Sequence, residues 1–260
     1  MSTTPVNDEP NSPPAGESQG SANLATTPYY TIIILSAIGV VFLCQQLMFE
    51  DTVLFLTGLV KPLFAEGEYW RLFTASVVHG GVMHVAFNGF ALFMLGRLVE
   101  VLSARANVSI VFLISALFGG FLSFAFLPDG VSVGASGGIV GLLGFLTVYS
   151  FRRRKLLSNA MFKNMVFNIV FIGFVGVLIN STDSNLKIDN YGHLGGLIAG
   201  AIYGLFQVPD DLYQDPRVAG PWLKRCGIAA LVIILLTALA TAGMLVTWYV
   251  VTGDLIPIYS

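Results

Sequence analysis

The stretch VGASGGIVGLLG, residues 133–144, is the most informative part of this 260-residue sequence. It places a single serine, Ser136, among closely spaced glycines at the start of a strongly apolar run. Glycines that recur every three or four residues let the backbones of two helices approach each other closely. The stretch therefore predicts a tightly packed apolar helix. It also poses a question, whether Ser136 only packs there or acts as a nucleophile.

The composition of the whole chain indicates a membrane protein. Hydrophobic residues make up 55% of it and charged residues only 11%, with 28 glycines and 20 phenylalanines. A soluble domain needs a charged exterior, whereas a helix bundle that faces lipid does not. The formal net charge is −2 at pH 7. We expect the lipid bilayer as a partner, and no nucleic acid.

The apolar runs predict an all-α, polytopic membrane helix bundle. Residues 1–28 are polar, rich in Pro, Ser, Thr and Asn, and are expected to be a disordered tail. Residues 29–208 are expected to form a six-helix core, 209–225 a cytoplasmic connector, and 226–260 a seventh transmembrane helix with a short extracytoplasmic tail. The division rests on apolar runs at about 30–48, 81–103, 107–127, 136–151, 165–180, 191–208 and 226–250.

The positions of Lys and Arg predict how the spans are oriented. If the N-terminus is cytoplasmic, ten of these residues fall on the cytoplasmic side and only Lys61, Arg71 and Lys187 on the other. Positive residues concentrate in cytoplasmic loops, so we expect a cytoplasmic N-terminus and an extracytoplasmic C-terminus. Segment 49–80 is then a long external loop at the outer interface. The tail has no basic signal-peptide region and no mitochondrial presequence pattern, which favours the plasma membrane.

Ser136 and His193 are predicted to share a depth in the bilayer. Ser136 precedes Arg152 by sixteen residues, and His193 precedes Asp210 by seventeen. At the helical rise these separations are about 24 and 25 Å, which places both residues near the outer face. Polar groups at membrane depth are costly and are candidates for function.

A serine, a histidine and two further hydrogen-bond donors suffice for acyl transfer. His84 and Asn88 are four residues apart, so on a helix they point the same way. Ser136 would attack, His193 would take its proton, and the pair would donate hydrogen bonds to the developing oxyanion. Glycines repeat every four residues in the sixth span, at 192, 196, 200 and 204. They would let this span approach the fourth span and bring His193 to Ser136.

Three segments resemble the motif blocks of the rhomboid family of intramembrane serine proteases. They are WRLFTASVVHGGVMHVAFNGFALFMLGRLVE (70–100), GASG (134–137) and NYGHLGG (190–196). The resemblance covers most of residues 30–208, and the last span is similar to the rhomboid form with an added C-terminal helix. It implies a rhomboid-like six-helix core plus one C-terminal transmembrane helix.

The resemblance also implies roles for particular residues. Ser136 would be the nucleophile and His193 the general base of a dyad that needs no aspartate. His84, Asn88 and the backbone N–H of Ser136 would form the oxyanion hole. The framework positions that match the family are Trp70, Arg71, His79, Glu100 and Gly196. The sequence departs from the family at Val140, where many members carry an aromatic residue that stacks on the catalytic histidine.

The expected function is hydrolysis of peptide bonds in or near transmembrane segments of other membrane proteins, without a metal or cofactor. An intact helix hides its carbonyls in hydrogen bonds, so small or helix-destabilising residues are expected near the cut. One alternative is a non-catalytic rhomboid-like protein that binds transmembrane clients. A transporter is disfavoured because the span centres lack Asp, Glu, Lys and Arg. The sequence makes no prediction of the oligomeric state.

Overall fold

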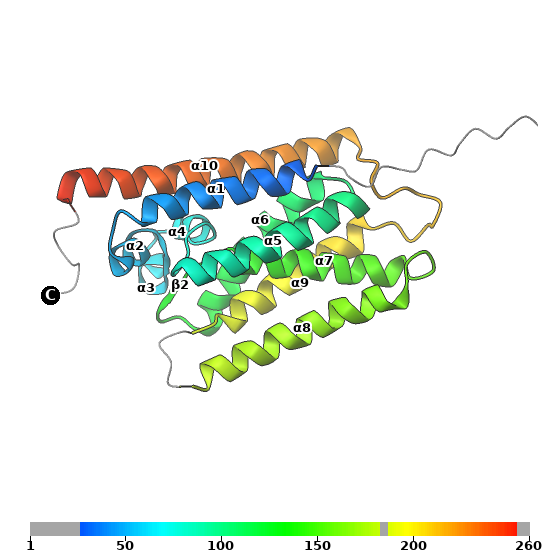
Figure 1. Ribbon diagram of the computed structural model, residues 1–260, viewed down its shortest axis with the longest axis horizontal. Coiled ribbons are helices and arrows are strands. Elements are labelled where there is room, and N and C mark those ends of the chain that lie inside the picture. Colours follow the sequence, from blue (N-terminus) through cyan, green and yellow to red (C-terminus); the bar gives the residue numbers. More distant parts are fainter. Residues whose placement is uncertain (1–26, 183–186, 254–260) are drawn as a thin grey trace, which may run out of the picture.

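The protein is a bundle of long α-helices in the computed structural model, which describes residues 27–182 and 187–253 (Figure 1). In this described part, the helices of 17 or more residues are α1 (Tyr29–Gln45), α5 (Val82–Leu102), α6 (Ala106–Phe126), α7 (Ser136–Arg152), α8 (Asn159–Asn180), α9 (Asn190–Gln207) and α10 (Pro221–Thr252). By length and composition, α5, α6, α8 and α10 could each cross a membrane. The predicted all-α membrane bundle is therefore confirmed. Most of the predicted disordered tail lies outside the described residues.

Two helices extend beyond the apolar runs that predicted them. α8 begins at Asn159 and α10 at Pro221, whereas the apolar runs begin at 165 and 226. Hydropathy does not mark these first turns because they carry polar residues, among them Lys163 and Lys224. Pro221 is favourable there because the first residues of a helix need no N–H for an intrahelical hydrogen bond.

α7 is the central helix of the bundle. It packs most extensively against α9 and α6, and its residues from 138 to 146 are all buried. A helix that is apolar on every side belongs in such an interior position. α8 lies along one edge of the bundle, and α1 and α10 lie side by side at the opposite edge (Figure 1).

α7 and α9 are in contact through their backbones. The carbonyl oxygen of Gly137 lies against Gly196, and that of Gly141 lies against Gly200, with no room for a Cβ on either glycine of α9. One turn further on, a Cβ on Gly144 would come within 2.5 Å of a carbonyl oxygen of α9. The close approach that the glycine spacing predicts for these two helices is confirmed.

The segment between α1 and α5 is folded into short elements that cover one end of the bundle (Figure 1). These are α2 (Glu50–Thr57), β1 (Leu59–Val60), α3 (Lys61–Ala65) and α4 (Arg71–Thr74). β1 pairs in antiparallel fashion with β2 (Val131–Ser132), with Leu59 opposite Ser132. The segment is therefore attached to the loop that leads into α7.

The buried guanidinium of Arg71 holds this segment together. It donates to the carbonyl oxygens of Phe55 at 2.7 Å and Gly58 at 3.0 Å. It also pairs with Glu68 at 2.6 Å and lies 4.6 Å from the centre of the Trp70 ring. A buried charge needs such partners to offset its lost hydration. These contacts support a framework role for Arg71 and Trp70.

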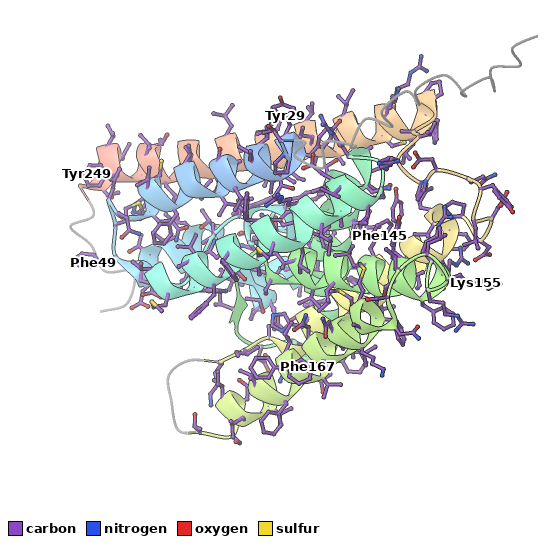
Figure 2. All side chains as sticks on the ribbon, turned by 45° about the vertical axis from the view of Figure 1, so that its right-hand side comes forward. Tyr29, Phe49, Phe145, Lys155, Phe167 and Tyr249 are labelled. Carbon is purple, nitrogen blue, oxygen red and sulfur yellow. The ribbon has the colours of Figure 1, made fainter. Side chains whose placement is uncertain are left out.

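Most of the cations gather at the other end of the bundle, which we call the basic end. It comprises the last turns of α5 and α7, the first turns of α6, α8 and α10, and the connector 208–220. Figure 2 shows Lys155 at this end and Phe49 at the opposite one. The ten Lys and Arg residues of the basic end are Arg97, Arg105, Arg152, Arg153, Arg154, Lys155, Lys163, Arg217, Lys224 and Arg225.

Gly200→Ala is expected to lower the melting temperature of the protein. The added methyl group would overlap the Gly141 carbonyl and force α7 and α9 apart, and overpacking of this kind costs about 1–3 kcal/mol. Gly243→Ala in α10 is the matched control, because nothing lies within 4 Å of a Cβ added there. It should leave the melting temperature unchanged or raise it, since alanine favours helix over glycine. Equal losses in thermal unfolding of the two variants would contradict the packing.

Candidate active site

Ser136 is the first residue of α7 and is half-buried. Two hydrogen bonds hold the chain just before it. The Gly134 N–H donates to the Ala75 carbonyl at 2.9 Å, and the Ala135 N–H donates to His79 Nε2 at 3.4 Å. The first N–H groups of a helix have no acceptor within the helix, and the helix dipole is positive at this end. Ser136 is therefore placed where negative charge is stabilised.

His84 and Asn88 lie on α5, directly against the loop that precedes Ser136. A Cβ on Gly134 would come 2.8 Å from His84 Nε2 and 3.5 Å from Asn88 Nδ2. Gly134 also has a φ of +121°, a backbone conformation that residues with side chains rarely adopt. A glycine is therefore required here for both backbone conformation and close approach.

The amide nitrogen of Asn88 is buried and has no hydrogen-bond partner among the described residues. Nearly all buried polar atoms in folded proteins have a partner, so an exception of this kind needs an explanation. A bound ligand that presents an oxygen beside Gly134 would supply one. The aligned donors that the four-residue spacing predicts are thus present on one face of α5.

His79 supports this arrangement from the loop before α5. Its ring packs edge-to-face on His84, with 5.1 Å between the ring centres. Its backbone exchanges two hydrogen bonds with the side chain of Gln45, at 2.8 and 3.2 Å. Burial, and then the neighbouring His84, lowers the pKa of His79 to about 3. The ring is therefore neutral and accepts the hydrogen bond from Ala135, which agrees with a framework role.

His193 lies in the first turn of α9. Gly192, which precedes His193, lies close to Gly137, which follows Ser136. A Cβ on Gly137 would be 3.5 Å from the Gly192 carbonyl oxygen. His193 Nδ1 is buried and has no hydrogen-bond partner in the described part of the chain. No hydrogen bond joins Ser136 to His193 among the described residues. Catalytic hydrogen bonds often form fully only when substrate is bound.

A cavity of about 40 Å³ lies beside Ser136. A volume of this size holds a few water molecules or a small side chain. Val140, one turn along α7, is buried and offers His193 no ring to stack on. Residues that line the cavity include Leu72, Ala116, Gly119, Ser136, Gly137 and Gly192.

Asp189 is a further residue of the site, absent from the sequence-based prediction. Its Oδ1 accepts the Gly192 N–H at 2.8 Å and so caps α9, while Oδ2 accepts the hydroxyls of Ser123 at 2.5 Å and Ser132 at 2.7 Å. These hydrogen bonds attach the turn that contains His193 both to α6 and to the loop before α7. An acidic residue just before an apolar helix is a known N-cap signal, but the two serine contacts have no local signature.

The described residues contain no group of three or more His, Cys, Asp or Glu side chains placed to hold a metal ion. The groups that the structure does bring together at the site are side chains and backbone donors. A hydroxyl at a helix N-terminus, an imidazole and two side-chain donors converge from three different helices.

The part of the chain that contains this site resembles a known protein domain. A family model described as the rhomboid domain matches residues 66–209. "Rhomboid protease GluP" of Bacillus subtilis (strain 168) is 38% identical over 141 residues, which are 54% of this chain and 26% of that protein. "RHOMBOID-like protein 6, mitochondrial" of Arabidopsis thaliana is 32% identical over 169 residues, covering 64% of this chain and 53% of that protein.

"Rhomboid-like protease 1" of Toxoplasma gondii is 31% identical over 177 residues, which are 65% of this chain and 57% of that protein. The chain thus spans between about a quarter and just over half of the length of these relatives. The matched domain covers more than half of the chain and contains His84, Asn88, Ser136 and His193. This chain therefore belongs to the rhomboid family.

Proposed function

We propose that the protein is an intramembrane serine endopeptidase, with Ser136 as nucleophile and His193 as general base. Membership of the rhomboid family supports protease chemistry within a membrane, and two relatives carry the word protease in their names. The observation that carries the proposal is the start of α7. There a serine at a helix N-terminus has donors of α5 on one side and the His193 turn of α9 on the other.

In the first half of the reaction, the Ser136 hydroxyl attacks the carbonyl carbon of the scissile peptide bond while His193 removes its proton. The carbonyl oxygen becomes an oxyanion. His84, Asn88 and the Ser136 N–H donate hydrogen bonds to it, and the positive end of the α7 dipole adds to its stabilisation. The unpartnered amide of Asn88 is suited to this task, since its hydrogen bond would form only with substrate.

In the second half, the tetrahedral intermediate collapses and His193 gives its proton to the leaving amine. The other part of the substrate stays on Ser136 as an ester. A water molecule, deprotonated by His193, attacks this ester and releases the second product, which restores the serine. The balance requires only the peptide and one water molecule.

The substrates are proposed to be transmembrane segments of other proteins, unwound near the cut so that their carbonyls are accessible. The cavity of about 40 Å³ beside Ser136 suits a small side chain at that point. The concentration of Lys and Arg at the basic end supports a cytoplasmic location for that end and an extracytoplasmic one for Ser136. The plasma membrane is the proposed location.

A non-catalytic rhomboid relative that binds transmembrane clients is the second candidate. It is favoured by Val140 in place of an aromatic ring and by the absence of a formed Ser136–His193 hydrogen bond among the described residues. A fluorophosphonate, which reacts only with an activated serine, separates the two candidates.

Ser136→Ala and His193→Ala should each abolish fluorophosphonate labelling and cleavage of a single-span model substrate. The double variant should be no worse than either, because the two residues act as a unit. Ser150→Ala, at the other end of α7, is the matched control. Its hydroxyl donates to the Thr147 carbonyl at 2.9 Å within its own helix, so activity should persist. A folded wild-type protein that neither labels nor cleaves would instead support the client-binding candidate.

Asn88→Ala should lower kcat by about 10²–10³ and leave KM nearly unchanged, because its hydrogen bond is made mainly in the transition state. His84→Ala should cost at least as much. His79→Ala should lower the melting temperature more than the rate of the chemical step, since its contacts are to Gln45 and Ala135. Steady-state kinetics in liposomes, with thermal unfolding in parallel, test all three. An Asn88→Ala variant as fast as wild type would place the oxyanion hole elsewhere.

Asp189 is proposed to position His193 by capping α9. Asp189→Ala should lower the free energy of unfolding by about 0.5–2 kcal/mol, the usual cost of a lost cap. It should also lower kcat, because the His193 turn is no longer fixed to α6. Asp189→Asn keeps an oxygen that can accept the Gly192 N–H. It should therefore retain most of the free energy of unfolding and most of kcat. If Asp189→Ala changes stability while kcat is unaffected, Asp189 has no positioning role.

A further inference from the structure

A second cavity, of about 410 Å³, lies at the basic end, at the opposite end of α7 from Ser136. It is formed by the ends of α5 and α7 and by the connector between α9 and α10, and its volume falls within the usual range for small-molecule sites. The residues that line it include Leu102, Tyr149, Arg153, Leu157, Leu212 and Arg217.

Arg153 is the unusual side chain of this cavity. It is only 2% exposed, yet no carboxylate lies within ion-pair distance of it among the described residues. Its two terminal nitrogens donate to the backbone carbonyls of Asp211, at 3.0 Å, and Gln214. Its Nε is buried and has no hydrogen-bond partner within residues 27–182 and 187–253. A buried charge with neutral partners and a free donor is costly unless an anion compensates it.

Two acidic residues of the connector, Asp211 and Asp215, have hydrogen-bond partners other than Arg153. Asp215 lines the cavity, but its carboxylate is held by the Arg217 side chain, at 3.0 Å from both Nε and Nη2. The carboxylate of Asp211 accepts the backbone N–H of Tyr213 at 2.9 Å. Because Asp215 is paired with Arg217, no carboxylate that lines the cavity neutralises the charge of Arg153. The cavity is therefore net positive.

Part of the remaining wall of the cavity is apolar, and the basic end is where we expect lipid headgroups to lie. Val101 and Leu102 end α5, and Leu156 and Leu157 follow α7, so they mark the ends of helices that lie in the bilayer. Lys155 lies at the same end of the bundle (Figure 2), and Arg152 and Arg154 are the sequence neighbours of Arg153. Basic pockets between the ends of transmembrane helices attract anionic lipid headgroups.

We propose that this cavity binds the headgroup phosphate of an anionic phospholipid. A phosphate oxygen accepts the free Nε–H of Arg153 and compensates its charge, and the acyl chains pass over Leu157 and Leu212 toward the bilayer. A guanidinium suits this role because its planar set of N–H donors matches phosphate oxygens. The site is separate from Ser136 and does not depend on the proposed protease activity.

The test is thermal unfolding of the full chain in detergent, titrated with phosphatidylglycerol, phosphatidylcholine or glycerol phosphate. Phosphatidylglycerol should raise the melting temperature of the wild type in a saturable way, and phosphatidylcholine should not. Arg153→Gln should need at least about tenfold more phosphatidylglycerol for the same shift, as expected for a lost charged hydrogen bond. Arg154→Gln is the matched control, because that guanidinium lies over the Phe151 ring outside the cavity. It should behave as the wild type.

Arg153 also holds the connector, so Arg153→Gln can fail to fold. Leu212→Trp then tests the site, since it fills the cavity and leaves every charge in place; it should weaken the phosphatidylglycerol effect to a similar extent. Equal responses of Arg153→Gln and Arg154→Gln, or of the wild type to both lipids, would overturn the proposal. Retention of the full effect in Leu212→Trp would do the same. Stabilisation by glycerol phosphate equal to that by phosphatidylglycerol would overturn the lipid assignment in favour of a soluble phosphate compound.

Discussion

The backbone contact between α7 and α9 is the constraint on which the rest of the structure depends. In lipid, apolar side chains gain little by leaving the solvent, so helices associate through close packing. Glycine makes this possible at Gly137 and Gly141 on one side and Gly196 and Gly200 on the other. Each glycine lowers helix propensity by about 1 kcal/mol relative to alanine. The close approach that these glycines allow brings the start of α9 beside the start of α7.

A second constraint fixes the loop that leads into α7. The short elements of segment 49–80 are attached to it by the β1–β2 pair and by hydrogen bonds that the N–H groups of Gly134 and Ala135 donate to Ala75 and His79. The loop is therefore held against α5 before any substrate arrives. Donors that are already in place stabilise a developing charge without further reorganisation, which is the main advantage of such a site.

The two ends of α7 have one physical feature in common. At the first end, the buried nitrogens of Asn88 and His193 have no partner among the described residues, and at the other end the same is true of Arg153 Nε. Such atoms are rare in folded proteins because each one forfeits its hydration. Our two proposals assign partners to two of these atoms: a peptide carbonyl to the amide of Asn88, and a lipid phosphate to Arg153 Nε.

The sequence by itself determined the membrane environment, the helical class and the family, and it supplied the residues that we propose as reactive. Hydropathy marks the helices, glycine spacing marks the α7–α9 face, and the four-residue spacing of His84 and Asn88 aligns them on α5. These are local signals, because each depends on residues within one helix. The helical turns within segment 49–80 have no comparable signal, because they are short and mixed in polarity.

Only the tertiary structure decided which distant residues complete the two proposed sites. Asp189 joins Ser123, 66 positions away, and Ser132, 57 positions away. Arg153 reaches carbonyls of the connector 58 and 61 positions further along the chain. Its neighbours 152, 154 and 155 are equally basic in sequence, and only packing distinguishes it. Burial and partnering depend on which helices come together, and a hydrogen bond between residues so far apart leaves no pattern in the sequence near either of them.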